Sequence, residues 1–162
     1  MNIETFLMRL GIRTYSYPVI TQITSKIEIQ FGDSLSTELG WIYGISAEVD
    51  GVTPKDPGVP LPTLAQSAGL YINMQYGQTW YLNDYRYTNL VYYAPSTGIP
   101  INSERMLRVN IPYSTDLKQS IIRNPLAQTG FSTMITFHYI PLKTYEYMVK
   151  NNVVKEIDLG IV

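Results

Sequence analysis

The sequence contains no cysteine among its 162 residues, and this absence removes several classes of site at once. No disulfide can form, and no thiolate is present to act as a nucleophile or as a soft metal ligand. The domain must therefore be held together by packing and hydrogen bonds alone. Long apolar runs are missing as well, since no stretch approaches the length of a membrane-spanning helix. The first residues show no basic segment followed by an apolar one, so no secretory signal is predicted.

Charge is also scarce. Charged residues make up 15% of the chain, against roughly 25% in an average soluble domain. The net charge is −1, and the basic residues are scattered, which predicts no sequence-specific nucleic-acid partner. Tyr, Thr, Ser, Asn and Gln replace the missing charge. A neutral polar surface of this kind suits packing against neighbours or recognition of sugars.

Residues for catalysis or metal binding are few. His138 is the single histidine, and its position inside an alternating segment favours a hydrogen-bonded strand residue. No nucleophile elbow, phosphate-binding loop or dinucleotide fingerprint is present. Glu48 and Asp84 are a conceivable carboxylate pair for sugar hydrolysis, and Asp50, Asp56 and Asp84 a conceivable calcium cluster without a known loop spacing. We expect no enzyme activity, no cofactor, and neither catalytic nor metal-binding residues.

The centre of the chain, residues 69–93, is rich in tyrosine and alternates with a period of two, which is typical of strands. Gly77 supplies a turn and Asn83-Asp84 a second break. Similar alternation predicts strands around residues 27–31, 39–50, 105–113 and 131–140. The side chains expected in the core are Leu70, Ile72, Met74, Leu107, Val109, Ile111, Ile135 and Phe137.

Helical spacing is confined to short segments. Residues 2–13 predict a short helix ended by Gly11, either packed on its own sheet or docked as an arm on a neighbour. Residues 114–122 could open as a helical turn. The predicted organisation is an arm or helix over 1–18, a β-sandwich over 19–142, and an edge strand or a short helix with a tail over 143–162. A Pro-rich loop over 50–67 interrupts the strands and favours an interface role.

About eight strands with uneven connections indicate an all-β fold, an eight-stranded antiparallel β-sandwich. The jelly roll fits the count best. An immunoglobulin-like sandwich is the alternative, although it lacks the Cys…Trp…Cys spacing.

Over residues 20–140 the chain resembles single jelly-roll capsid proteins of tailless icosahedral viruses and phages, particularly the vertex (penton) class. The resemblance is carried by the strand pattern, the low charge, the absent cysteines, the Pro-rich loop 53–63 and the polar connection STDLKQSIIRNPLAQTG over 114–130. It implies a virion protein, assembled in the host cytoplasm, whose identical subunits form a ring such as a pentamer. It further implies neighbouring capsid proteins as partners and no active site. Because the N-terminus lacks a basic arm, an underlying membrane or spike protein is an easier partner than the genome.

Two functions therefore remain open. A self-assembling capsid subunit would use Phe6, Leu7, Leu10, Val59 and Leu61 as its interface. A carbohydrate- or receptor-binding module of a virion spike or tail would use an exposed aromatic platform, formed by Trp80, Tyr81, Tyr85, Tyr87 and Tyr92.

Overall fold

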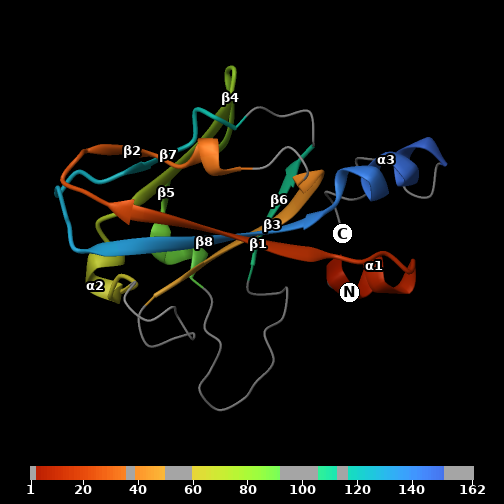
Figure 1. Ribbon diagram of the computed structural model, residues 1–162, viewed down its shortest axis with the longest axis horizontal. Coiled ribbons are helices and arrows are strands. Elements are labelled where there is room, and N and C mark those ends of the chain that lie inside the picture. Colours follow the sequence, from red (N-terminus) through yellow and green to blue (C-terminus); the bar gives the residue numbers. More distant parts are fainter. Residues whose placement is uncertain (1–2, 36–38, 50–59, 92–105, 113–116, 152–162) are drawn as a thin grey trace, which may run out of the picture.

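Extended strands dominate the molecule (Figure 1). The computed structural model describes residues 3–35, 39–49, 60–91, 106–112 and 117–151. The strands are β1 Tyr15–Ile23, β2 Glu28–Gln30, β3 Trp41–Glu48, β4 Tyr71–Tyr76, β5 Thr79–Arg86, β6 Leu107–Ile111, β7 Ile121–Arg123 and β8 Phe131–Ile140. The helices are α1 Ile3–Arg9, α2 Leu64–Ser67 and α3 Leu142–Lys150, with short 3-10 turns η1 Gly32–Ser34 and η3 Tyr87–Leu90. Within these ranges no helix combines the length and hydropathy needed to cross a bilayer.

The strands form two antiparallel four-stranded sheets, which confirms the all-β sandwich. The first sheet has the order β1-β8-β3-β6 and the second the order β2-β7-β4-β5. Apolar side chains from the facing surfaces of both sheets form one continuous core. Alternation along each strand leaves the opposite surface of each sheet for other contacts.

Six of the eight predicted core residues are buried in this core. Leu70, Ile72, Met74, Ile111, Ile135 and Phe137 are each no more than 1% exposed. Leu107 and Val109 are only partly buried, because β6 is the last strand of its sheet among the described residues, where it pairs with β3 alone. The strand predicted over residues 131–140 is confirmed as β8.

The alternation predicted over residues 39–50 does not hold along β3, because all eight residues of the strand are buried. Its pairing with β6 and β8 shifts register between Ile42 and Gly44, so a bulge inverts the alternation there. Ile42 and Ile45 therefore both face the main core, while Trp41 and Tyr43 face outward. A second apolar cluster covers these two rings.

That second cluster joins both long helices to the outer surface of the first sheet. Leu7 of α1 and Tyr145 and Met148 of α3 pack with Trp41, Tyr43, Met106 and Ile140. Helix α1 is ended by the turn that follows it. In this turn the Ile12 N–H donates to the Leu7 carbonyl, the Gly11 N–H donates to the Met8 carbonyl, and Gly11 has a φ of +73°. This is a Schellman arrangement, and it confirms the prediction that Gly11 ends the helix. Helix α1 thus packs on its own sheet, the first of the two alternatives.

Three boundaries differ from the prediction. Strand β1 begins at Tyr15, inside the segment assigned to the arm, and Pro18 is tolerated there because β1 is an edge strand. The predicted helical turn over 114–122 overlaps strand β7 at residues 121 and 122, which are extended because β7 pairs with β2 and β4. Asn83-Asp84 do not end β5, since the strand absorbs them. The segment after Pro141 is helix α3, the short-helix alternative for this part of the chain, because Tyr145 and Met148 are three residues apart on its buried face.

Candidate functional site

An open pocket of about 340 Å³ lies on the outer surface of the second sheet. Its described lining is polar and comes from strands β2, β4, β5 and β7 and the turn before β7. The lining residues are Glu28, Asn73, Gln75, Trp80, Asn83, Asp84, Gln119, Ile121 and Arg123. The volume is at the lower end of the range of about 300–1,000 Å³ that small-molecule sites occupy.

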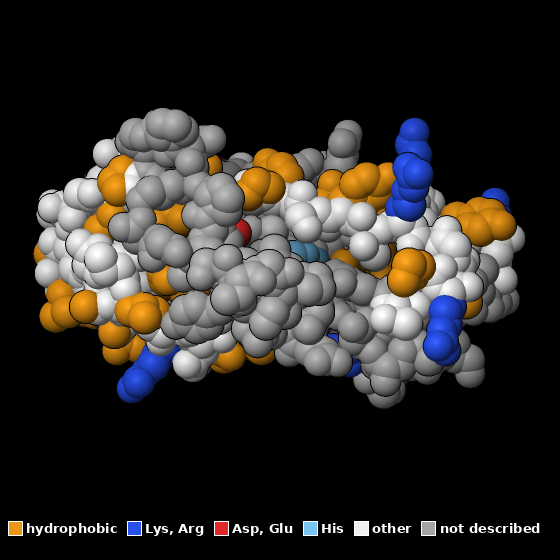
Figure 2. All heavy atoms as spheres, turned by 90° about the horizontal axis from the view of Figure 1, so that it is seen from below, with side chains coloured by type: hydrophobic (Ala, Val, Ile, Leu, Met, Phe, Trp, Pro, Cys, Tyr) orange, Lys and Arg blue, Asp and Glu red, His pale blue; other side chains and the backbone are white. Residues whose placement is uncertain are grey.

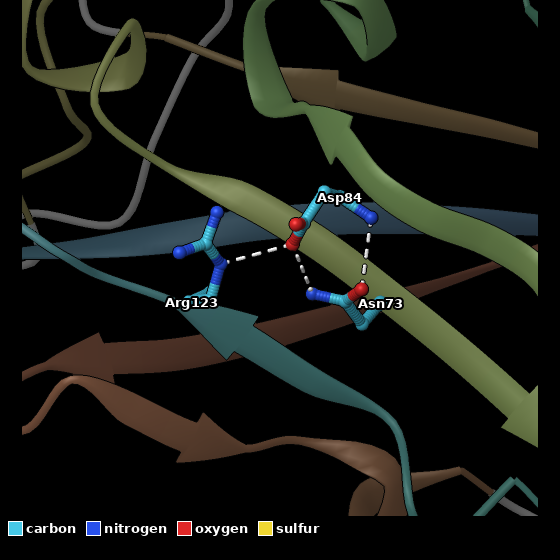
Figure 3. Close-up of polar contacts among 3 residues, drawn as sticks. All are labelled: Asn73, Asp84 and Arg123. Atoms are coloured by element: carbon cyan, nitrogen blue, oxygen red, sulfur yellow. Dashed lines mark hydrogen bonds and ion pairs between the residues drawn. The ribbon is translucent and has the colours of Figure 1, made fainter.

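A bulge in β5 places Asp84 in this pocket. Ile72 pairs with Tyr85 and Met74 with Leu82, so Asn83 and Asp84 together lie opposite Asn73. Asp84 has a left-handed backbone, φ 47°, which Asp and Asn tolerate better than most residues. Its N–H donates to Asn73 Oδ1 at 2.8 Å, and Asn73 Nδ2 donates to Asp84 Oδ1 at 3.1 Å (Figure 3). The largely buried Asn73 side chain therefore holds both the backbone and the carboxylate of Asp84.

Arg123 approaches the same carboxylate from β7. Its Nε donates to Asp84 Oδ1 at 2.9 Å, and its guanidinium lies 4.9 Å from the centre of the Tyr71 ring. The hydrogen bond from Asn73 and the bond and charge of Arg123 lower the pKa of Asp84 against a smaller opposing effect of burial. The carboxyl group is therefore ionised at neutral pH. The pair is partly exposed, so its own contribution to stability is small.

Trp80 lines the pocket with a side chain that is 47% exposed. It lies on β5 opposite Gln75, next to the tight turn at Gly77, whose φ is +57°. Gln75 Nε2 donates to the Gly77 carbonyl at 2.7 Å and so fixes one amide of the pocket. The pocket thus combines one exposed indole with amide groups, carboxylates and a guanidinium.

The predicted aromatic platform is not one continuous strip. Trp80 is exposed, but Tyr81 and Tyr85 pack partly buried against the main core, and Tyr87 is fully buried. The assignment of Tyr87 to an exposed platform is therefore wrong. The reason is that η3 turns the chain after β5 and directs this ring between the sheets. Tyr92 lies outside the described residues.

The residues predicted to form the subunit interface differ in their exposure. Leu7 is 0% exposed in the second cluster and Leu61 is 4% exposed, so both side chains are occupied within their own chain. Leu10 is 40% exposed and remains available for contact. Val59 and the Phe6 side chain lie outside the described residues.

His138 is the hydrogen-bonded strand residue that the sequence favoured. Its Nδ1 lies 3.1 Å from Ser16 Oγ and its Nε2 lies 2.9 Å from Ser46 Oγ, on the two neighbouring strands. Burial lowers the pKa of His138 to about 4, so the ring is neutral at pH 7.

Glu48 and Asp84, the conceivable carboxylate pair for sugar hydrolysis, do not lie together in the fold. Glu48 follows the core residue Ala47 and so lies on the outer surface of the first sheet, whereas Asp84 lies on that of the second. Among the described residues no group of three or more His, Asp or Glu side chains could hold a metal ion. Asp50 and Asp56 lie outside those residues.

Sequence reasoning named Trp80 as a platform residue and Asp84 only as a conceivable carboxylate for hydrolysis or calcium binding, and it missed the partners that shape the pocket. Asn73 had a local signal, because it occupies the polar parity of an otherwise apolar strand. Arg123 had none, because its proximity to Asp84 depends on β7 pairing with β4 across about fifty residues of chain.

No protein-family model, curated protein or solved structure matches this chain at a significant level.

Proposed function

We propose that the sandwich is a jelly roll and that the chain is a self-assembling virion shell subunit, placed at the vertices. The observation that carries the proposal is the strand pairing. Each strand pairs with its counterpart counted from the other end of the series: β1 with β8, β2 with β7, β3 with β6, and β4 with β5. A long antiparallel ribbon folded at the β4–β5 hairpin gives this pairing, and rolling it up adds β3–β8 and β4–β7.

The double-sheet jelly roll is used repeatedly by viral capsid and lectin domains. The inner face of each sheet is buried in the shared core and the helices cover part of the outer face of the first sheet, which favours the ends, edges and loops for contacts between subunits. The low charge favours such contacts, because little charge has to be desolvated when surfaces meet. Identical subunits in a closed ring, with neighbouring capsid proteins and an underlying membrane or spike protein as further partners, fit this surface.

Exposed apolar side chains favour a head-to-tail arrangement. One group, the helix-end patch, is formed by Met8, Leu10, Tyr147 and Val149 of α1, its C-terminal turn and α3. The other, the loop-end patch, is formed by Ile27, Leu64 and Leu126 around α2 and the loops beside it. Helices α1 and α3 lie at one end of the molecule and α2 at the other (Figure 1). Two different patches at opposite ends suit heterologous contacts, which form rings when their rotation closes.

Seen from below, the described apolar side chains lie at both ends of that face and along its upper edge, and the Lys and Arg side chains drawn there stand apart from one another (Figure 2). The described residues thus form no basic cluster in this view of the kind that contacts a nucleic acid.

The test is the mass of the protein under native conditions, followed by electron microscopy of the assembled species. We expect a closed ring, a pentamer for a vertex protein. Leu126→Asp and Met8→Asp should each block the ring, because each places a charge in one patch. Gln78→Asp, on the exposed β4–β5 turn, is the matched control and should assemble normally. A monomeric wild type, or normal rings from both patch variants, would overturn the proposal.

The second candidate is a carbohydrate- or receptor-binding module of a spike or tail. One observation favours it: the exposed Trp80 opens onto the polar pocket of the second sheet. A monomer that binds a glycan would support this function, and a ring without glycan binding would support the first.

A further inference from the structure

We infer that the pocket around Asp84 binds a neutral saccharide, with Trp80 stacking on a sugar ring and Asp84 and Arg123 holding two neighbouring hydroxyl groups. The inference rests on the second candidate function, and it names the ligand class and the residues of that site. It does not depend on whether the chain assembles.

The first step is the rigidity of the carboxylate. Asn73 is only 6% exposed, yet its amide is directed at Asp84 and bonds both its backbone N–H and its Oδ1. A left-handed aspartate in the middle of a strand costs conformational energy, and such strain tends to occur at functional positions. The bulge and Asn73 together keep Asp84 fixed before any ligand arrives.

The second step concerns the hydrogen-bonding atoms that remain free for a ligand. Asp84 Oδ1 is occupied by Asn73 and Arg123, whereas Oδ2 has no hydrogen-bond partner among the described residues, and the side chain is 50% exposed. The Nε of Arg123 is likewise occupied. Its two terminal amino groups are directed away from Asp84 in Figure 3, and no described residue bonds them. The pocket therefore presents a fixed acceptor beside fixed donors.

Hydroxyl groups fit this combination. A hydroxyl can donate to the carboxylate and accept from the guanidinium at once, and a pair of neighbouring hydroxyls can bridge the two. The amides of Gln75, Asn83 and Gln119 add further donors and acceptors of the same neutral kind.

The aromatic ring and the charge balance of the pocket narrow the class of ligand further. Sugar rings carry apolar C–H faces that pack against an aromatic face, and Trp80 offers such a face at the pocket. The described lining contains two carboxylates, Glu28 and Asp84, and one guanidinium, Arg123. This excess of negative charge disfavours phosphates, sialic acids and nucleic acids, and leaves neutral hexoses as the class that fits.

The experiment uses the full chain and a panel of neutral probes: methyl glycosides of glucose, galactose, mannose and N-acetylglucosamine, their disaccharides, and one sialylated trisaccharide. Saturation-transfer NMR detects weak binding. Acrylamide quenching gives a second measurement, because Trp41 is 0% exposed and the quenched signal comes from Trp80. We expect saturable binding of at least one neutral member and weaker binding of the sialylated one.

The variants locate the site. Trp80→Ala and Asp84→Asn should each weaken binding at least tenfold. Tyr76→Ala should bind as wild type, because Tyr76 is 48% exposed on the same hairpin but does not line the pocket. Trp80 and Asp84 are exposed, so the thermal melts of these variants should match wild type. Absence of saturable binding across the panel, or unchanged binding by both variants, would overturn the inference. Native mass of the same samples reports assembly separately, so the two proposals can fail independently.

Discussion

The hydroxyl of Tyr87 donates to the backbone carbonyl of Glu48 at 2.8 Å and so ties the end of β5 in the second sheet to the end of β3 in the first. The same oxygen accepts the N–H of Met134 on β8 at 3.3 Å. Burial raises the pKa of this hydroxyl, so it stays protonated and keeps donating at every physiological pH. One ring thus fastens the two sheets at the point where the chain leaves β5.

Tyr87→Phe should lower the free energy of unfolding by about 1–3 kcal/mol, because the change leaves buried backbone groups without their partner. Urea unfolding measures the loss. Tyr85→Phe is the matched control: it removes a hydroxyl that has no hydrogen bond among the described residues, and it should cost under about 0.5 kcal/mol. Equal losses in the two variants would show that the link between the sheets adds nothing.

Ile111→Ala should lower the free energy of unfolding by about 2–5 kcal/mol, because its side chain is 1% exposed and its loss leaves a cavity. Val109→Ala, two residues earlier on the same strand, should cost clearly less because that side chain is only partly buried. Denaturant unfolding of both proteins gives the comparison. The opposite ranking would contradict the deeper burial of Ile111 on the inward face that the two residues share.

The helix-end of the molecule supplies a third prediction. Leu7→Ala should cost about 2–5 kcal/mol, since Leu7 is fully buried in the second cluster. Met8→Ser should leave the melting temperature nearly unchanged, because Met8 is 71% exposed. It follows that deleting residues 1–13 should destabilise the domain as well as remove part of the helix-end patch. A truncated protein that melts like the full chain would contradict this packing.

His138 predicts a pH dependence with a definite sign. Its pKa is near 6.5 in an unfolded chain and about 4 in the folded protein. Above pH 6.5 both states are neutral at this residue and it adds no slope. Between pH 6.5 and 4 the unfolded chain binds more protons, so the free energy of unfolding falls as pH falls, by up to about 3 kcal/mol in all.

Urea unfolding of wild type and His138→Gln at pH 7 and pH 4.5 measures this contribution. Carboxylates titrate in both proteins, so the difference between the two pH slopes belongs to His138. We expect the wild type to lose more stability over this interval than the variant. Identical slopes would place the histidine in water rather than between Ser16 and Ser46.

The sequence predicted those parts of the fold in which one alternation runs without interruption. Strand β8 is such a case, since Phe131, Ile135 and Phe137 keep one parity along its whole length. Where a bulge intervenes, the pattern misleads: β3 changes parity near Tyr43, and β5 continues through an Asn-Asp pair that looks like a turn. Strand β7 is too short to have a pattern, and only its sheet neighbours make it extended.

The pocket could be predicted to the same limited extent. The crowding of aromatic residues on the central hairpin made Trp80 a candidate, but alternation could not predict its exposure, because the register shifts between Trp80 and the buried Leu82. The Asn73–Asp84 contact depends on the register across a bulge, and the Arg123 contact depends on a third strand from elsewhere in the chain. The spacing of these residues along the sequence therefore predicts neither of the two contacts.

The pairing of β1 with β8 also determines when the first sheet can form during synthesis of the chain. Ser16 and His138 are 122 positions apart, and among the strands that the structure describes β1 pairs with β8 alone. At about 5–20 residues per second, a ribosome needs on the order of ten seconds to deliver the second strand after the first. Until then β1 has no ladder to join, and after that the long-range closure is intrinsically slow. During that interval the nascent chain exposes unpaired strand edges, to which a chaperone can bind.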